Sequence, residues 1–208
     1  MVLDLKERVN EGLLFSALET GTFKFRVYEP VTTEIVLGAA GKVEKELYIE
    51  HVEADGVPIR RRSGGGGTVV LSPGQVVVAL VKEVNEQFRN VEFMRKINQW
   101  IIDVLSLLGV KGVKHAGISD LALDGKKILG SSLHRKKYFL FYQSSLLVDN
   151  EIKLFERYLR YPDRVPEYRR ERGHLKFCTN LTLEGYRFPV DFIVEKIKAK
   201  VMQSIESL

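Results

Sequence analysis

The chain has 208 residues, 45% of them hydrophobic and 28% charged, and it carries a net charge of +5. This composition excludes a disordered or fibrous protein and predicts one globular domain over residues 1–208. Because 32 basic residues stand against 27 acidic ones, we expect mostly solvated surface charge and no nucleic-acid partner.

The N-terminal segment MVLDLKERVNEGLL is amphipathic and contains acidic residues, unlike a signal peptide. No apolar run is long enough to span a bilayer, so we expect a cytoplasmic protein without a membrane partner. Between residues 3 and 19, apolar residues recur on one side of a predicted helix that ends at Gly21. They are Leu5, Val9, Leu13, Leu14, Ala17 and Leu18.

Strands and helices follow without an internal repeat. The segments TFKFRVYEP, residues 22–30, and VVVALV, residues 76–81, predict strands. Apolar residues at helical spacing predict a helix between Glu92 and Leu108, with Gly109 as its C-cap.

Hairpins dominate the second half of the chain. In ISDLALDGKKILGSS, residues 118–132, strand-like stretches flank Asp124 and Gly125, a pair favoured in type I′ turns. The segment KKYFLFYQSSLLVD, residues 136–149, predicts another strand pair, and helical spacing returns after Pro189. The sequence therefore predicts an α+β fold in which a mixed, largely antiparallel β-sheet is flanked by α-helices.

Four consecutive glycines, residues 64–67, separate the arginines 60–62 from a strand that looks buried. Glycine in a sheet loses much backbone freedom and packs nothing, so another interaction should offset this cost. A flexible linker normally lies between polar segments, and a bulge needs only one glycine. Consecutive backbone N–H groups beside guanidinium groups instead suit an anion, either a carboxylate or a phosphate.

Two motifs carry a resemblance to a known family. RRSGGGGTVVLSPGQ, residues 61–75, resembles the RRx(S/T)GGGAV(Y/F)HDxGN signature of the lipoate-protein ligase A family, in the biotin and lipoate protein ligase superfamily. GKKILGSS, residues 125–132, is similar to the family's G(R/K)KIxGSA, which carries its lysine, and GISDL stands where the family has GRNDL. Weaker matches extend the resemblance from about residue 10 to 185.

The resemblance implies a biotin/lipoate ligase-like catalytic domain that depends on ATP and Mg²⁺. Such an enzyme would join lipoate or octanoate to ATP as an acyl-adenylate. It would then pass the acyl group to a lysine of a lipoyl carrier domain, in a 2-oxoacid dehydrogenase subunit or the glycine cleavage H protein. A chain of 208 residues has no room for the C-terminal accessory domain of some members, so a separate protein would supply it or this form does without.

Carried over by motif, Lys127 would be the catalytic cation and Asp120 a magnesium ligand. The implied residues for binding substrate and cofactor are Arg62, Gly65, Gly66, Gly67, Thr68, Gln75, Gly130, Ser131 and His134. A fixed ammonium and backbone donors would stabilise the negative charge that accumulates when a carboxylate attacks the α-phosphorus.

Other interpretations stay open. Adjacent strand residues point to opposite faces, so only one of Lys126 and Lys127 can enter a pocket, and the motif favours Lys127. Asp120 could merely begin the hairpin, while Arg60 and Arg61 would form a solvated basic rim. Departures from the family motifs leave open a different acyl acid, an altered nucleotide pocket or a non-catalytic lipoyl- or carrier-binding module. The departing residues are Leu71, Ser72, Ile118, Ser119 and His134.

Cys178 is the only cysteine, so the chain cannot form an internal disulfide. Octanoyltransferases of the superfamily use a cysteine thioester in place of adenylation, and GGTVVLSPGQ also resembles the GGxVTYHGPGQ of one such group. A thiol nucleophile needs a lowered pKa, and His174 and Lys176 lie near in sequence. A buried, unreactive thiol is the alternative, so a transferase that acts through Cys178 stands beside the ligase hypothesis.

Overall fold

The computed structural model describes residues 3–85 and 89–208. Its strands are β1 (Leu3–Arg8), β2 (Lys24–Tyr28), β3 (Glu34–Leu37), β4 (Ile59–Arg61), β5 (Val69–Leu71), β6 (Gln75–Glu83), β7 (Lys114–Ala116), β8 (Asp120–Leu123), β9 (Lys126–Lys136) and β10 (Phe139–Leu147). Its helices are α1 (Glu11–Thr20), α2 (Val43–Glu46), α3 (Ile49–Ala54), α4 (Asn90–Leu107), α5 (Lys153–Tyr158), α6 (His174–Phe177) and α7 (Val190–Ser204). Two 3₁₀ turns are η1 (Glu167–Arg169) and η2 (Ile205–Ser207).

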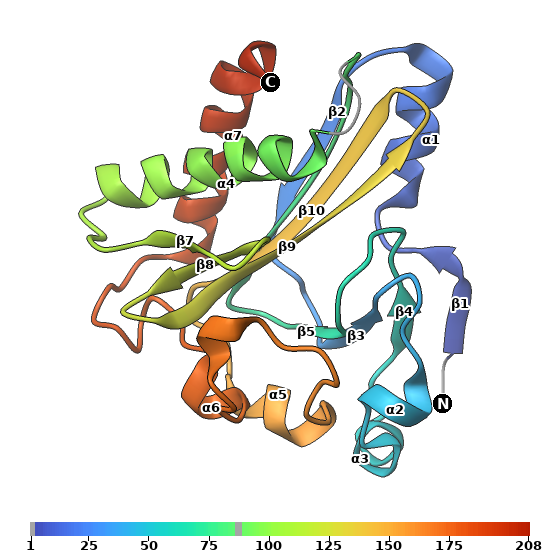
Figure 1. Ribbon diagram of the computed structural model, residues 1–208, viewed down its shortest axis with the longest axis vertical. Helices are drawn as coiled ribbons and strands as arrows, with labels where there is room; N and C mark the ends of the chain where they lie inside the picture. Colours follow the sequence, from blue (N-terminus) through green and yellow to red (C-terminus); the bar gives the residue numbers. More distant parts are fainter. Residues whose placement is uncertain (1–2, 86–88) are drawn as a thin grey trace.

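Two sheets form the framework (Figure 1). The large sheet has the strand order β2-β6-β10-β9-β8-β7, and each of its pairs is antiparallel. The small sheet has the order β1-β4-β3-β5 and combines parallel with antiparallel pairs. The predicted α+β fold with a mixed, largely antiparallel sheet is therefore confirmed.

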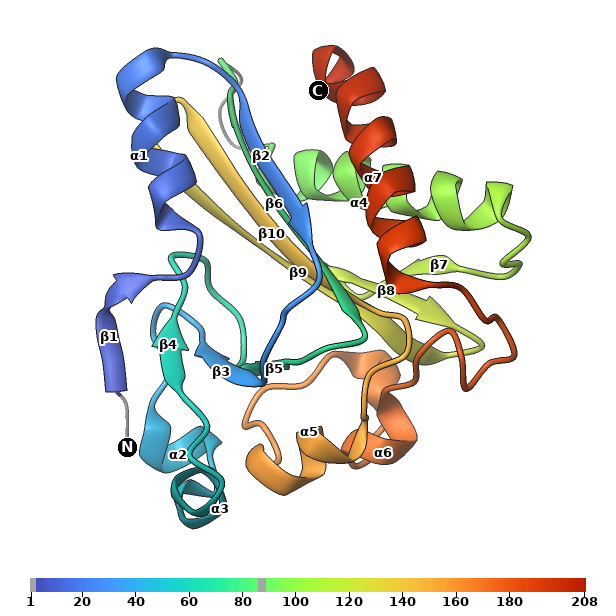
Figure 2. The ribbon, with the colours of Figure 1, turned by 180° about the vertical axis from the view of Figure 1, so that it is seen from behind.

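The two faces of the large sheet are covered differently (Figure 2). Side chains of α4 and α7 form the main core with alternate residues of β10, such as Leu140 and Tyr142. The intervening residues Phe139 and Phe141 pack on the opposite face, against α1. Farther along this second face, the small sheet packs on β6 through Val77.

Most predicted elements lie where the sequence places them. The helix after Glu92, the strand that precedes Pro30 and the final helix after Pro189 correspond to α4, β2 and α7. The hairpin turn has positive φ angles at Asp124 (48°) and Gly125 (75°), as a type I′ turn requires.

The predicted N-terminal helix over residues 3–19 is wrong in its first half. Residues 3–8 form β1, which pairs in parallel with β4, and α1 begins only at Glu11. The break occurs at Asn10, whose φ of 60° places it in the left-handed region. The segment LDLKER alternates leucine with polar residues at period two, and pairing with β4 favours this period over the helical one.

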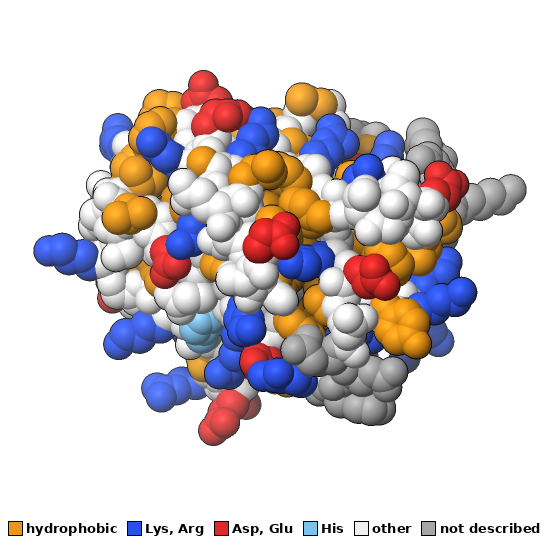
Figure 3. Space-filling view, turned by 90° about the horizontal axis from the view of Figure 1, so that it is seen from above, with side chains coloured by type: hydrophobic (Ala, Val, Ile, Leu, Met, Phe, Trp, Pro, Cys, Tyr) orange, Lys and Arg blue, Asp and Glu red, His pale blue; other side chains and the backbone are white. Residues whose placement is uncertain are grey.

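The surface fits the charge balance of the sequence. On the face shown in Figure 3, basic and acidic side chains are interspersed with apolar ones. Within the described residues, no helix combines the length and the apolar character that crossing a membrane requires.

Candidate active site

Two adjoining cavities lie against the second face of the large sheet, in the part that α1 leaves uncovered. The large cavity measures about 560 Å³ and is bounded by α5, α6 and the segment around residues 159–169. The small cavity measures about 120 Å³ and is lined on one side by apolar residues such as Val36, Leu71 and Val77. Lys127 and Asp120 line both cavities and therefore stand at their border.

A β-bulge brings the lysine to this border. The register pairs Leu129 and Lys127 with consecutive residues of β8, so Ile128 is left without a partner. Because of this extra residue, Ile128 and Leu129 both pack into the core against α4 and α7. Lys127 and Gly130, three positions apart, then share the face that lines the cavities. Without the bulge they would lie on opposite faces.

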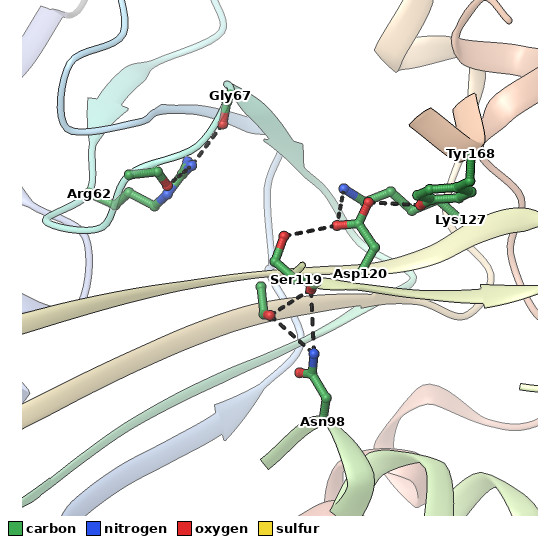
Figure 4. Close-up of polar contacts among 9 residues, drawn as sticks. Arg62, Gly67, Asn98, Ser119, Asp120, Lys127 and Tyr168 are labelled. Carbon is green, nitrogen blue, oxygen red and sulfur yellow. Dashed lines mark hydrogen bonds and ion pairs between the residues drawn. The ribbon is translucent and has the colours of Figure 1, made fainter. Parts of the chain in front are cut away.

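Lys127 is held in a polar cluster at the cavity border (Figure 4). Its Nζ lies 2.9 Å from Oδ1 of Asp120, whose side chain is only 8% exposed. Asp120 Oδ2 accepts a hydrogen bond from the Tyr168 hydroxyl at 2.8 Å, and Oδ1 accepts one from Ser119 Oγ at 3.3 Å. A Cβ added at Gly130 would lie 2.8 Å from the lysine Nζ, so the amine packs directly over this glycine.

A second polar network fixes the start of β8 from the α4 side (Figure 4). The carbonyl oxygen of Ser119 accepts hydrogen bonds from Ser131 Oγ at 2.6 Å and from Asn98 Nδ2 at 3.4 Å. Asn98 is fully buried, and its Oδ1 accepts a hydrogen bond from the Tyr142 hydroxyl at 2.5 Å. The hydroxyl of Ser131, expected to bind substrate, is thus committed to holding the residue that precedes Asp120.

The glycine segment is organised by the buried Arg62. Arg62 Nη2 donates to the carbonyl oxygens of Gly65 and Gly67, both at 2.8 Å, and Nη1 donates to Val36 at 3.2 Å. Burial lowers the pKa of Arg62 to about 10, which the carboxylate of Glu46 partly opposes. The guanidinium therefore holds the backbone of the glycine segment in place. A direct contact between Arg62 and a ligand stays a prediction.

The four glycines differ in what they require. A Cβ at Gly64 would lie 2.8 Å from Ser132 Oγ, and Gly66 has a φ of +93° that favours glycine. The loop also needs a glycine outside it, because a Cβ at Gly38 would lie 2.0 Å from the Gly66 carbonyl oxygen. At the remaining two glycines, a Cβ would meet nothing within 4 Å. Gly66 and Gly67 line the small cavity, whereas Gly65 is not part of either cavity wall.

Thr68 already binds a carboxylate in this structure. Glu46 Oε2 accepts hydrogen bonds from the Thr68 backbone N–H at 3.0 Å and from its hydroxyl at 2.6 Å. The other oxygen of Glu46 accepts the backbone N–H of Lys42 at 3.0 Å. The Thr68 amide, expected to face the substrate anion, is therefore engaged by the protein itself, and Glu46 links α2 to the glycine segment.

We expect Glu46→Ala to lower the free energy of unfolding by about 1–3 kcal/mol, because it removes charge-assisted hydrogen bonds and leaves buried Arg62 less compensated. Urea unfolding, read as the shift in the transition midpoint, measures this effect. Glu44→Ala is the matched control, since Glu44 lies exposed on the same helix. Equal midpoints for the two variants would contradict the role of Glu46 as a clamp.

Besides Gly65, two residues implied by the motif lie outside both cavities. Gln75 is fully buried, and its amide donates to the Val70 carbonyl oxygen at 3.0 Å, so it braces the turn between β5 and β6. His134 pairs with Phe141 farther along β9, in the region that α1 covers. Burial and the nearby positive charge of Arg8 lower the pKa of His134. Neither side chain contacts the cavity in this conformation.

Three basic residues at the motifs have structural partners. Arg61 is not part of a solvated rim, because it donates to three backbone carbonyls within residues 38–41. Arg60 is exposed and lies 3.4 Å from Glu34, as expected for a surface residue. Lys126 points away from the cavities and forms an ion pair with Glu184 at 3.0 Å.

The donor set around Asp120 does not form a metal site by itself. Within residues 3–85 and 89–208, no group of three or more His, Cys, Asp or Glu side chains could hold a metal ion. Both carboxylate oxygens of Asp120 are already engaged, by Lys127, Ser119 and Tyr168. The role that Asp120 shows is to hold the lysine amine, and Mg²⁺ binding stays a prediction.

Cys178 lies beside Lys127 in the folded chain, although the two residues are far apart in the sequence. It lines the large cavity and forms an isolated bridge with Lys127, whose carbonyl accepts the Thr179 N–H at 3.0 Å. Burial raises the pKa of the thiol to about 11, although the charges of Lys127 and Arg169 oppose this rise. The thiol is therefore in place but protonated at neutral pH.

Three residues that organise the site were not predicted from the sequence. Asn98 is a polar residue on the apolar face of a predicted helix, and this position is the signal that could have revealed it. Glu46 and Tyr168 occur in segments without regular patterning, and only the folded chain brings them to Thr68 and Asp120.

Solved structures first define the fold. A structure described as a bipartite lipoate protein ligase and its E2 lipoyl domain from Thermoplasma acidophilum superimposes with a TM-score of 0.77 at 18% identity, covering 99% of this chain and 83% of the other. A lipoate-protein ligase A bound with ATP gives a TM-score of 0.76 at 16% identity, covering 99% and 85%. The fold is that of the lipoate ligase catalytic domain.

The family follows from the sequence match. The model of the lipoyl protein ligase A/B catalytic domain matches residues 14–206, and the chain belongs to this family. Among curated relatives, a lipoate-protein ligase of Streptococcus pyogenes is 30% identical over 131 residues, covering 63% of this chain and 38% of the relative. An octanoyltransferase of Thermosynechococcus vestitus is 26% identical over 136 residues, covering 64% and 58%. The chain thus spans well under half of that ligase, and both activities occur among its relatives.

Proposed function

We propose that the protein is an ATP-dependent lipoate-protein ligase. It would activate lipoate or octanoate as an acyl-adenylate and transfer the acyl group to a lysine of a lipoyl carrier domain. The observation that carries this proposal is the amine of Lys127 at the border between a large and a small cavity. The large cavity has room for a nucleotide, and the apolar wall of the small one suits an acyl tail.

The chain's own residues suit the first step. A carboxylate and a triphosphate repel each other, so an ammonium group between the two cavities would favour their approach. Negative charge that grows on the oxygens of the α-phosphate would be stabilised by the Lys127 amine, which Asp120 and the packing over Gly130 already fix in place. ATP and the acyl acid are bound by structural neighbours of this chain, described with ATP and with lipoic acid.

Lipoate-dependent exchange of labelled pyrophosphate into ATP tests the proposal, because only a reversible adenylation step produces it. Octanoate serves as a second acid. Absence of exchange with either acid, combined with lipoate binding by calorimetry, would instead support a non-catalytic binding module.

An octanoyl or lipoyl transferase is the second candidate, because Cys178 lines the same cavity as Lys127. In that case the reaction would need no ATP and would pass through a thioester on Cys178. The raised pKa of the thiol argues against ready nucleophilic attack.

Under the ligase proposal, Cys178→Ala should retain acyl transfer within about twofold of the unmodified protein, since the thiol takes no part in adenylation. Intact-protein mass spectrometry after incubation with an octanoyl donor provides the second readout. A thioester mass on Cys178, together with loss of transfer in the variant, would establish the transferase in place of the ligase.

A further inference from the structure

Arg169 is a buried cation in the wall of the large cavity. The residue is 4% exposed, and its guanidinium carbon lies 4.6 Å from the Tyr161 ring centroid and 4.7 Å from that of Phe177. Nε donates to the Arg172 carbonyl at 2.8 Å. These contacts hold the planar group in one orientation in η1, directly after Tyr168.

The aromatic rings contact this guanidinium but do not neutralise its charge. Among the described residues, no carboxylate forms an ion pair with Arg169, and its Nη2 is buried without a hydrogen-bond partner. Burial lowers its pKa accordingly. A buried charge without an ion pair is costly, so an anion that entered from the cavity and contacted Arg169 would offset this cost.

The surrounding charges indicate which anion this would be. Lys127 pairs with Asp120, whereas none of the described carboxylates forms an ion pair with Arg169, although Glu167 of the same turn also lines the cavity. A guanidinium presents parallel N–H donors that match phosphate oxygens. We propose that Arg169 binds a phosphate group of the nucleotide and the pyrophosphate that leaves, an assignment that rests on the proposed ligase function.

The experiment uses inorganic pyrophosphate as the probe. Calorimetry should show that pyrophosphate binds the unmodified protein, and that Arg169→Gln weakens this binding at least tenfold. Arg169→Lys keeps the charge without the planar fork and should recover part of the affinity. Arg170→Gln, at the exposed neighbouring arginine outside both cavities, is the matched control and should bind like the unmodified protein.

Thermal unfolding with and without pyrophosphate separates binding from structure. Pyrophosphate should raise the unfolding temperature of the unmodified protein and of Arg170→Gln, and not that of Arg169→Gln. If Arg169→Gln unfolds at a lower temperature but binds pyrophosphate normally, the residue is structural and the inference is wrong. It is equally wrong if the unmodified protein does not bind pyrophosphate.

Two further arms separate this inference from the proposed function. Calorimetry with lipoate should give equal affinities for the unmodified protein and Arg169→Gln, and loss of lipoate binding instead would assign Arg169 to the carboxylate. Absence of lipoate-dependent exchange would contradict the ligase, while pyrophosphate binding that depends on Arg169 would still support the phosphate site.

Discussion

Replacement of Lys127 by alanine should lower lipoate-dependent exchange of pyrophosphate into ATP by at least 10²–10³-fold, the range of about one lost electrostatic donor at a reacting oxyanion. The reason is positional: this amine stands at the border of both cavities and is paired with Asp120 at 2.9 Å. The exchange rate at saturating ATP and lipoate measures the loss. Exchange that survives the substitution would remove Lys127 from the mechanism.

Lys126→Ala is the control for this experiment. It removes the adjacent amine, which pairs with Glu184 and does not line either cavity, so exchange should be unchanged. Lys127→Met preserves most of the stem that packs over Gly130 and should be as inactive as the alanine variant. Circular dichroism of each variant shows whether a loss of exchange reflects unfolding.

The second large effect is expected from Gly130→Ala. The added methyl group would lie 2.8 Å from Lys127 Nζ and 2.9 Å from Cε, so the flexible end of the lysine must move aside. Stability should change little, because no backbone atom blocks the methyl group. Exchange should fall about 10²-fold, since displacement of a reacting group by about 1 Å has effects of this size.

Gly12→Ala is the matched control for Gly130→Ala. Gly12 lies in α1, and a Cβ there would meet nothing within 4 Å, so this variant should keep its exchange activity. A Gly130→Ala protein with normal exchange would show that the amine can act from another position, and the proposed geometry would fall.

The sequence was most informative where local pattern decides structure. The α4 spacing, the Asp124-Gly125 turn and the proline before α7 each set a conformation within a few residues. The helix prediction for the N-terminal segment was wrong because leucines spaced for a strand also fit a helix over so short a stretch. Pairing with β4 selects the strand.

The site could be predicted only in part from the motifs. They identified Lys127, Asp120 and the glycine segment, which the structure places around one pair of cavities. They gave no indication that Glu46 would accept a hydrogen bond from Thr68 or that Arg62 would donate one to the backbone of the glycine segment. Such contacts join residues far apart in the chain, and their geometry exists only after the two sheets have packed together.

The unpaired residue in β9 sets which way its neighbours point. If Ile128 joined a regular ladder, Lys127 would lie on the same face as Leu129 and its amine would turn toward the hydrophobic interior. Deletion of Ile128 would instead keep Lys127 on the cavity face, directly before Leu129, and would remove one apolar side chain from the core. The bulge thus lets one strand direct a charged side chain toward the cavities while two consecutive apolar side chains pack in the core.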